Sequence, residues 1–213
     1  MFHFLGLVLG LRSYRSFAEL VGHERENWDW RRIVSPRDSE IVIVVPHGGN
    51  IEAGTAEIGC AVAGAEFSLY CFEAIKSRDN GRLHIASTRF DDPACLELVA
   101  RSRIVVTVHG CTGSKPFVSM GGLHHPLRQE IAGGLSAAGF SVLQTDPRHR
   151  GVNPGNICNR GREGRGVQLE ISHGLRRAMF AGLVRLQRGR TTPVFERFVA
   201  ALRGVLTGSA GPA

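Results

Sequence analysis

Two stretches decide the fold: Ile41-Val42-Ile43-Val44-Val45-Pro46-His47-Gly48-Gly49 and Ile104-Val105-Val106-Thr107-Val108-His109-Gly110. Each opens with a short apolar run rich in β-branched residues, which is typical of a strand covered on both faces. Helical patterns lie between the two runs, over 54–64 and 92–102. Strands that alternate with helices predict an α/β sandwich, with the sheet in the middle and helices on both faces.

Weaker patterns extend this alternation in both directions. The capping-box spacing from Ser16 to Glu19 predicts a short helix within 12–36. The further expected strands are 82–87, 140–145 and 167–172, and the further expected helices are 126–138 and 192–206. We expect one α/β catalytic domain over residues 1–182, followed by a basic C-terminal helix and a disordered tail over 183–213.

The composition excludes several classes of protein. The chain has 213 residues, of which 43% are hydrophobic and 21% charged, so a globular domain with a sizeable core is expected. The apolar opening 2–11 is too short to span a bilayer and lacks a basic flank and a cleavage site. Five cysteines without a C-x-x-C pair argue against a disulfide framework. We therefore expect a cytoplasmic protein with no membrane partner and no signal peptide.

Positive charge is concentrated in the last third of the chain. Residues 151–213 hold ten arginines, no lysine and three acids, so this part carries a charge of +7 and residues 1–150 are neutral. Such a segment could face nucleic acid, a membrane or an acidic substrate, or it could be a solvated basic helix.

Two histidines follow the buried strand runs directly. The carboxyl ends of strands are where α/β folds gather functional side chains, which selects His47 and His109. Glu52 lies five residues after His47 on a glycine-rich loop. Two imidazoles and one carboxylate form the ligand set of many catalytic zinc sites. Hydrogen-bonded structural histidines are the alternative interpretation.

A second carboxylate is the candidate general base. Alternation along 167–172 places Glu170 opposite three apolar side chains of an otherwise buried strand. A zinc hydrolase needs one carboxylate that is not a ligand, to accept a proton from water. The alternative is an ion pair between Glu170 and Arg148, Arg150 or Arg176.

The loop 153–162 is rich in proline, glycine and asparagine. Its amides and guanidinium groups suit the recognition of amides and carboxylates, although a turn-rich surface loop is equally consistent with the pattern. The candidate substrate-binding residues are Arg148, Arg150, Asn156, Asn159, Arg160 and Arg162.

Seven stretches, in this order, resemble the phage-type poly-γ-glutamate hydrolase family, which is also labelled a phage-related replication protein. They are 46–55, 67–70, 83–93, 108–110, 121–123, 153–160 and 166–176. The resemblance covers about residues 12–180 and leaves out the basic segment after Phe180. After 121–123 an acid is expected, but the chain has His124-His125, which we expect to be an exposed pair.

The resemblance implies a zinc peptidase with a mixed, mostly parallel sheet similar to that of zinc carboxypeptidases. It implies one Zn²⁺ ion held by His47, Glu52 and His109, with Glu170 as the catalytic carboxylate. The implied substrate is an acidic polymer, γ-linked polyglutamate, or a related small amide, and phage lysis could release the enzyme. His84 is expected in the core or as a partner that orients a ligand.

Two other functions stay open. One is a zinc amidohydrolase that acts on small N-acyl amino acids. The other is a nucleic-acid-associated phage replication protein, although no helix-turn-helix, zinc-finger or aromatic RNA-binding motif is present. The sequence leaves the oligomeric state open.

Overall fold

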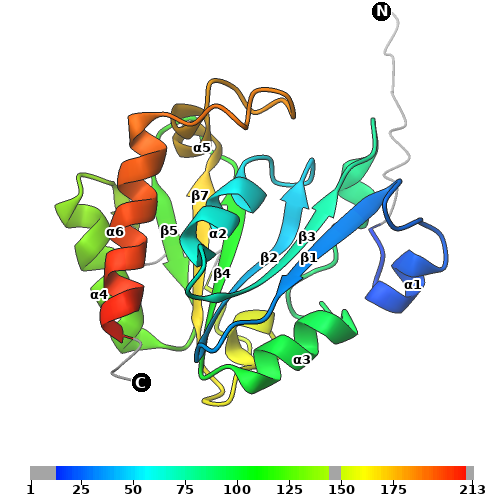
Figure 1. Cartoon of the computed structure of the whole chain (residues 1–213), viewed down its shortest axis with the longest axis horizontal. Coiled ribbons are helices and arrows are strands. Elements are labelled where there is room, and N and C mark those ends of the chain that lie inside the picture. The colour runs from blue at the N-terminus through cyan, green and yellow to red at the C-terminus, as the bar shows by residue number, and fades with distance from the viewer. Residues whose placement is uncertain (1–12, 144–149, 210–213) are drawn as a thin grey trace, which may run out of the picture.

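The computed structural model describes residues 13–143 and 150–209. Its centre is a seven-stranded sheet in the order β1-β3-β2-β4-β7-β5-β6 (Figure 1). The strands are β1 Trp30–Ser35, β2 Ile41–Gly49, β3 Ser68–Ala74, β4 Ile104–Cys111, β5 Val118–Gly121, β6 Val142–Leu143 and β7 Val167–Ser172. Four of the six strand pairs are parallel, while β1 with β3 and β5 with β7 are antiparallel. The predicted α/β fold with a mixed, mostly parallel sheet is confirmed.

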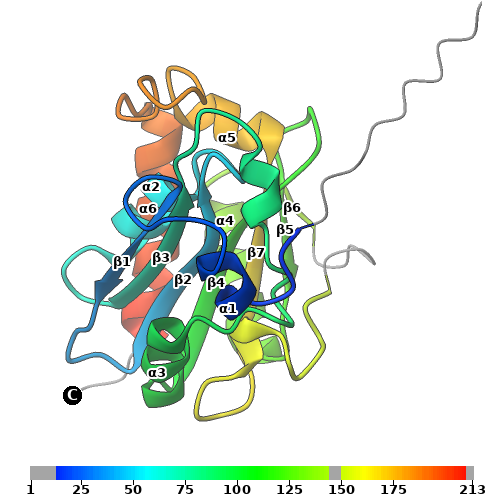
Figure 2. The same ribbon diagram turned by 90° about the vertical axis from the view of Figure 1, so that its right-hand side faces the viewer.

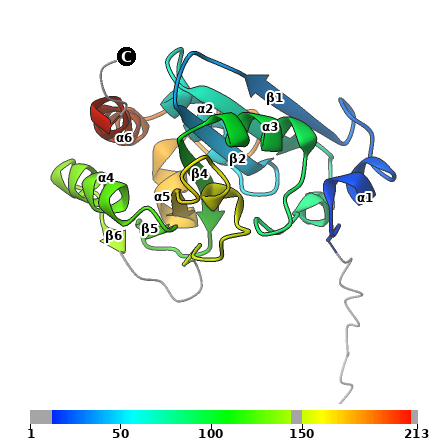
Figure 3. The same cartoon turned by 90° about the horizontal axis from the view of Figure 1, so that it is seen from below.

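Helices cover both faces of the sheet (Figures 2 and 3). The helices are α1 Phe17–Val21, α2 Thr55–Ala63, α3 Pro93–Arg101, α4 His125–Ala137, α5 His173–Met179 and α6 Pro193–Ser209, with 3-10 turns η1 Asn80–Leu83 and η2 Ile157–Asn159. Ile41, Ile43 and Val45 of β2 pack in one apolar core with α2, α4 and α6. Val42 and Val44 pack in the other with α1 and α3. Residues 41–45 of β2 are therefore all apolar because both faces of the strand are buried there.

The C-terminal segment is part of the first core. Phe198, Leu202 and Leu206 of α6 are fully buried, and the helix packs against α4 and α2. Arg188, which precedes α6, is buried and bonds Glu57 of α2 at 2.8 Å. The boundary expected after residue 182 is therefore not a packing boundary, because apolar side chains on both sides of it share one core. Residues 210–213 lie outside the described part of the chain.

β2 continues beyond the expected end at Val45 and includes the histidine loop. Its pairing with β3 shifts between Val45 and Gly48, which accommodates Pro46 because proline has no N–H for the ladder. Gly49 has φ +67°, and a side chain there would collide with the backbone of Ala74. The two glycines thus let the chain turn tightly at the carboxyl end of β2.

Several expected elements differ from the structure. The strand expected over 82–87 is wrong: η1 ends at Leu83, and an irregular segment follows. Leu83 and Ile85 are fully buried, so an alternating burial pattern arises here without strand pairing. The strands β1, β3 and β5 and the helix α5 are not among the elements expected from the sequence. No helix in the described residues is long and apolar enough to cross a membrane.

Candidate metal centre and active site

Two histidines from neighbouring strands meet at the carboxyl edge of the sheet. β2 and β4 are adjacent and parallel, so His47 and His109 leave the sheet side by side. Their Nδ1 atoms are 3.1 Å apart, and both side chains are buried. Two nitrogens that each bind zinc at about 2 Å must lie within about 4 Å of one another. The pair satisfies this requirement.

The third predicted ligand joins them. The Glu52 backbone N–H donates to the carbonyl of His47 at 3.0 Å, which curls the loop back over the strand end. Glu52 Oε1 lies 3.1 Å from His47 Nδ1, and Oε2 lies 3.7 Å from His109 Nδ1. Glu52 Oε2 also accepts the Gly110 N–H at 2.8 Å. The structure therefore brings together all three residues that the sequence singled out as ligands.

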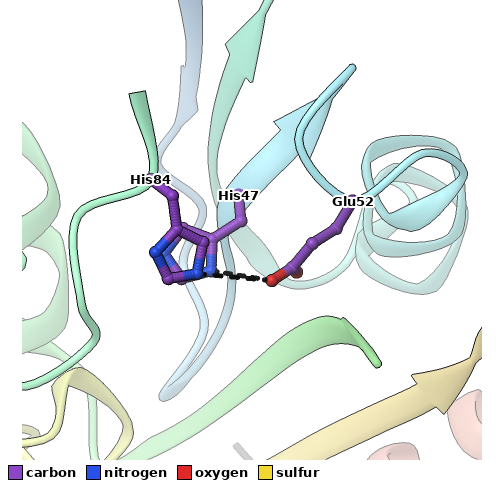
Figure 4. A group of neighbouring side chains, drawn as sticks. All are labelled: His47, Glu52 and His84. Carbon is purple, nitrogen blue, oxygen red and sulfur yellow. Dashed lines mark ion pairs between the residues drawn. The ribbon is translucent and has the colours of Figure 1, made fainter. Parts of the chain in front are cut away.

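A fourth residue, His84, belongs to the same cluster. Its Nε2 is 3.7 Å from Glu52 Oε1, and its ring stacks on that of His47 with centroids 3.8 Å apart. Ligand atoms of His47, Glu52 and His84 lie within 4.8 Å of one another (Figure 4). The His84 side chain is 42% exposed, so its expected place in the core is wrong. His84 does not follow a strand, so its position in the sequence does not mark it as a site residue. Only the tertiary structure places it beside His47 and Glu52.

The protonation of His47 is fixed by a neighbouring carbonyl. His47 Nε2 lies 2.7 Å from the carbonyl oxygen of Ile85, which can only accept, so Nε2 carries the proton. Nδ1 faces the Glu52 carboxylate at 3.1 Å, and in the neutral ring that burial favours it holds a lone pair. Two electron-rich atoms at this distance favour a cation between them, so the donor set fits a divalent metal.

Charge and burial oppose each other within the cluster. Burial lowers the pKa of His47, although Glu52 works in the other direction. Burial would raise the pKa of Glu52, but His47, His109 and His84 outweigh it and hold that pKa well below its usual value. Burial also works against the charged form of His109, yet Glu52 and Glu170 raise its pKa. The cluster thus keeps Glu52 ionised.

The candidate base lies beside this cluster. Glu170 of β7 is in register with His109 of β4, and it is 8% exposed. Gln168 Nε2 donates to Glu170 Oε1 at 2.9 Å, and Asn156 Nδ2 donates to Gln168 Oε1 at 2.9 Å. Asn156 Oδ1 accepts the backbone N–H of Cys158, which can only donate. The backbone N–H of Cys158 thereby sets the orientation of both amides, so the Gln168 side chain presents an N–H donor to Glu170.

The two asparagines of the expected substrate loop have structural roles. Asn156 belongs to the amide chain that ends at Glu170. Asn159 is buried, and its Oδ1 accepts the N–H groups of Leu123 and Gly166 at 3.1 Å. Its Nδ2 donates to two loop carbonyls, including that of Gly151. These contacts hold the loop together.

The candidate arginines are scattered. Arg162 bonds Glu40, which directly precedes β2, so it lies at the edge of the sheet opposite His47. Arg150 and Arg160 are exposed, and Arg160 donates to the Phe90 carbonyl at 3.4 Å. Arg148 lies outside the described residues. The structure therefore separates Arg162 from the other candidates.

The expected exposed pair at 124–125 is also only half correct. His124 is buried and caps α4, because its Nδ1 accepts the Leu127 N–H at 3.2 Å. His125 is exposed, next to Arg128.

A mixed α/β sheet that presents buried imidazoles and carboxylates at its carboxyl edge defines the class: an α/β protein with a candidate divalent-metal centre. The sequence matches the poly-gamma-glutamate hydrolase family over residues 14–201. The chain belongs to this family of hydrolases. The match extends past Phe180, where the resemblance by motif ends, and includes the first half of α6.

Individual relatives agree with this assignment. UPF0714 protein YndL of Bacillus subtilis (strain 168) is 34% identical over 187 residues, which are 87% of this chain and 73% of YndL. A bacteriophage poly-gamma-glutamate hydrolase superposes with a TM-score of 0.91 at 30% identity, covering 94% of this chain and 99% of that one. The zinc-free apo form of YndL superposes with a TM-score of 0.88 at 31% identity, covering 93% and 98%.

Proposed function

We propose that this chain is a zinc-dependent hydrolase that cleaves γ-glutamyl amide bonds of poly-γ-glutamate or of related acidic amides. One observation carries the proposal: Glu52 lies 3.1 Å from His47 and 3.7 Å from both His84 and His109, beside a separate buried carboxylate, Glu170. Family membership supports the reaction class. A relative described in a zinc-free form supports zinc as the metal.

His47 and Glu52 are the proposed ligands common to every arrangement. The third is either His109, as the sequence predicts, or His84, which the structure adds. A catalytic zinc site keeps one position open, so three protein ligands are expected rather than four. Measuring the zinc affinity of His109→Ala and His84→Ala decides between the two residues. The variant that removes the ligand is expected to lose far more affinity than the other variant.

Glu170 is the proposed proton carrier. Bound zinc would polarise the substrate carbonyl and make water more acidic. Glu170, oriented by the amide of Gln168, accepts the proton of the attacking water and passes it to the leaving amine. The exposed Arg150 and Arg160 are proposed to bind substrate carboxylates.

The partners are proposed to be an acidic polymer or a small acidic amide. An N-formylglutamate amidohydrolase from Ralstonia eutropha shares the fold, with a TM-score of 0.56 at 12% identity. That likeness concerns the fold alone, so small N-acyl substrates form one arm of the test.

The test measures metal content and substrate range together. Protein purified without added zinc is expected to contain about one zinc per chain, and His47→Ala is expected to lose it. His125→Ala, which removes an exposed imidazole of α4, serves as the matched control and keeps the metal. Poly-γ-glutamate, N-formylglutamate and duplex DNA are then offered to the wild-type protein. Absence of zinc, or salt-sensitive DNA binding without amide hydrolysis, contradicts the proposal.

A further inference from the structure

Arg176 is a buried arginine that the proposed chemistry does not use. It lies on α5, close to the carboxyl edge of the sheet, and is 5% exposed. Its guanidinium donates to three backbone carbonyls: Nε to Ile171 at 3.1 Å, Nη1 to Ala53 at 2.6 Å and Nη2 to Cys111 at 3.1 Å. These carbonyls belong to three separate segments of the chain.

Each segment carries a residue of the site. Ala53 follows Glu52, Ile171 follows Glu170, and Cys111 lies two residues after His109. One planar guanidinium therefore fixes the spacing of the loop after β2, the end of β4 and the end of β7. Arginine suits this role because its donors lie in a rigid plane, whereas a lysine ammonium has no such fork.

The absence of a side chain at Gly110 makes room for this contact. A Cβ at Gly110 would lie 2.6 Å from Arg176 Cζ, closer than real Cβ atoms approach. The Gly110 N–H in turn donates to Glu52 Oε2 at 2.8 Å. Gly110 thus contacts the guanidinium on one side and the candidate ligand on the other.

Its charge also fits the position. Burial lowers the pKa of Arg176, while the nearby charges of Glu52 and Glu170 oppose that change. A buried cation close to two carboxylates partly compensates their desolvation.

We propose that Arg176 is a positioning residue that clamps the segments bearing Glu52, His109 and Glu170 in the geometry needed to hold the metal. The inference rests on the proposed function for its purpose. The clamp itself is defined by contacts present without the metal, so it can be tested in the metal-free protein.

The first test compares Arg176→Gln and Arg176→Lys with Arg177→Gln, which changes the exposed neighbour on the same helix. Zinc Kd is measured by competition with a chromogenic chelator. Partners outside the ligand set typically contribute 10–100-fold to metal affinity, so both Arg176 variants are expected to weaken binding by about that factor. Arg177→Gln is expected to bind as the wild type does.

The second test measures hydrogen exchange of the Gly110 amide by NMR in metal-free protein. Loss of the clamp frees the Glu52 loop, so Arg176→Lys is expected to speed exchange of this amide by about tenfold or more. Amides of the distant helix α3 are expected to keep wild-type rates, which separates a local effect from general destabilisation.

The third test uses Gly110→Ala, which displaces the guanidinium without removing it. If Gly110 and Arg176 act through one contact, their effects on zinc Kd are less than additive in a double-mutant cycle with Arg176→Gln. Additive effects, or wild-type zinc Kd and Gly110 exchange in Arg176→Lys and Gly110→Ala, overturn the clamp. If the wild-type protein binds no zinc, the proposed function fails, and Gly110 exchange still decides the clamp.

Discussion

Replacing Glu170 by glutamine isolates the proton-accepting role of this carboxylate. Glutamine has nearly the same shape, and its side-chain carbonyl can still accept from Gln168 Nε2, as Glu170 Oε1 does at 2.9 Å. The amide chain from Asn156 therefore stays satisfied, and the strand pairing with His109 does not involve the side chain. What is lost is the group that accepts a proton from water.

The expected size of the effect follows from that loss. General bases contribute about 10²–10⁴-fold to turnover, which corresponds to about 3–5 kcal/mol of activation free energy. Because the neighbouring hydrogen bonds persist, we expect Glu170→Gln to lower kcat by about 10³-fold. Zinc content is expected to be unchanged, since Glu170 is not among the proposed ligands.

The assay follows release of amines from poly-γ-glutamate by zinc-loaded protein of measured metal content. Glu97→Gln, an exposed change on α3, is the control for the loss of one carboxylate and is expected to keep wild-type turnover. If Glu170→Gln retains more than about a tenth of wild-type kcat with full zinc content, Glu170 is not the base and the assigned role is wrong.

Three further predictions follow from the structure. The pKa of Glu52 is lowered in the folded protein, so its ionised form stabilises the fold above the unfolded pKa of about 4.3, and this stabilisation is lost as pH falls through the folded pKa. In urea unfolding of metal-free protein, the free energy of unfolding is therefore expected to fall more steeply between pH 5 and pH 3 in the wild type than in Glu52→Gln. Asp92→Asn removes the charge of a fully buried carboxylate that accepts an N–H of Arg32 at 3.0 Å. The free energy of unfolding in urea is expected to fall by about 2 kcal/mol, and a change below about 0.5 kcal/mol contradicts this. Arg162→Gln removes the ion pair with Glu40, which lies about 20 Å along β2 from His47, so kcat/KM is expected to stay unchanged. A tenfold loss of kcat/KM would show that Arg162 contributes to the active site.

The central strands and two of the metal-centre histidines could be predicted from sequence for a physical reason. The runs at 41–45 and 104–108 are almost entirely apolar and rich in β-branched residues, and such runs form strands buried on both faces. Parallel neighbours end at the same edge, so residues that follow them must meet there. The 3.1 Å separation of His47 and His109 Nδ1 agrees with that reasoning.

Other site residues carried no local signal. His84 lies in an irregular segment that is held by the burial of Leu83 and Ile85, and the Ile85 carbonyl binds His47. The alternating apolar residues of this segment predict a strand. The prediction is wrong because every second side chain can be buried without any pairing of the backbone. The buried asparagine of the substrate loop, Asn159, hydrogen-bonds that loop's own backbone, which composition alone could not distinguish from substrate contacts.

The sequence by itself determined the two central strands, the carboxyl edge where they end and the pairing of His47 with Glu52 across a glycine turn, because these depend on local periodicity and on residues close in the chain. Only the tertiary structure decided that His84 joins the cluster and that Arg176 bonds carbonyls as distant as that of Ala53. Backbone carbonyls are chemically identical along the chain, so no residue pattern marks which of them a buried guanidinium will reach.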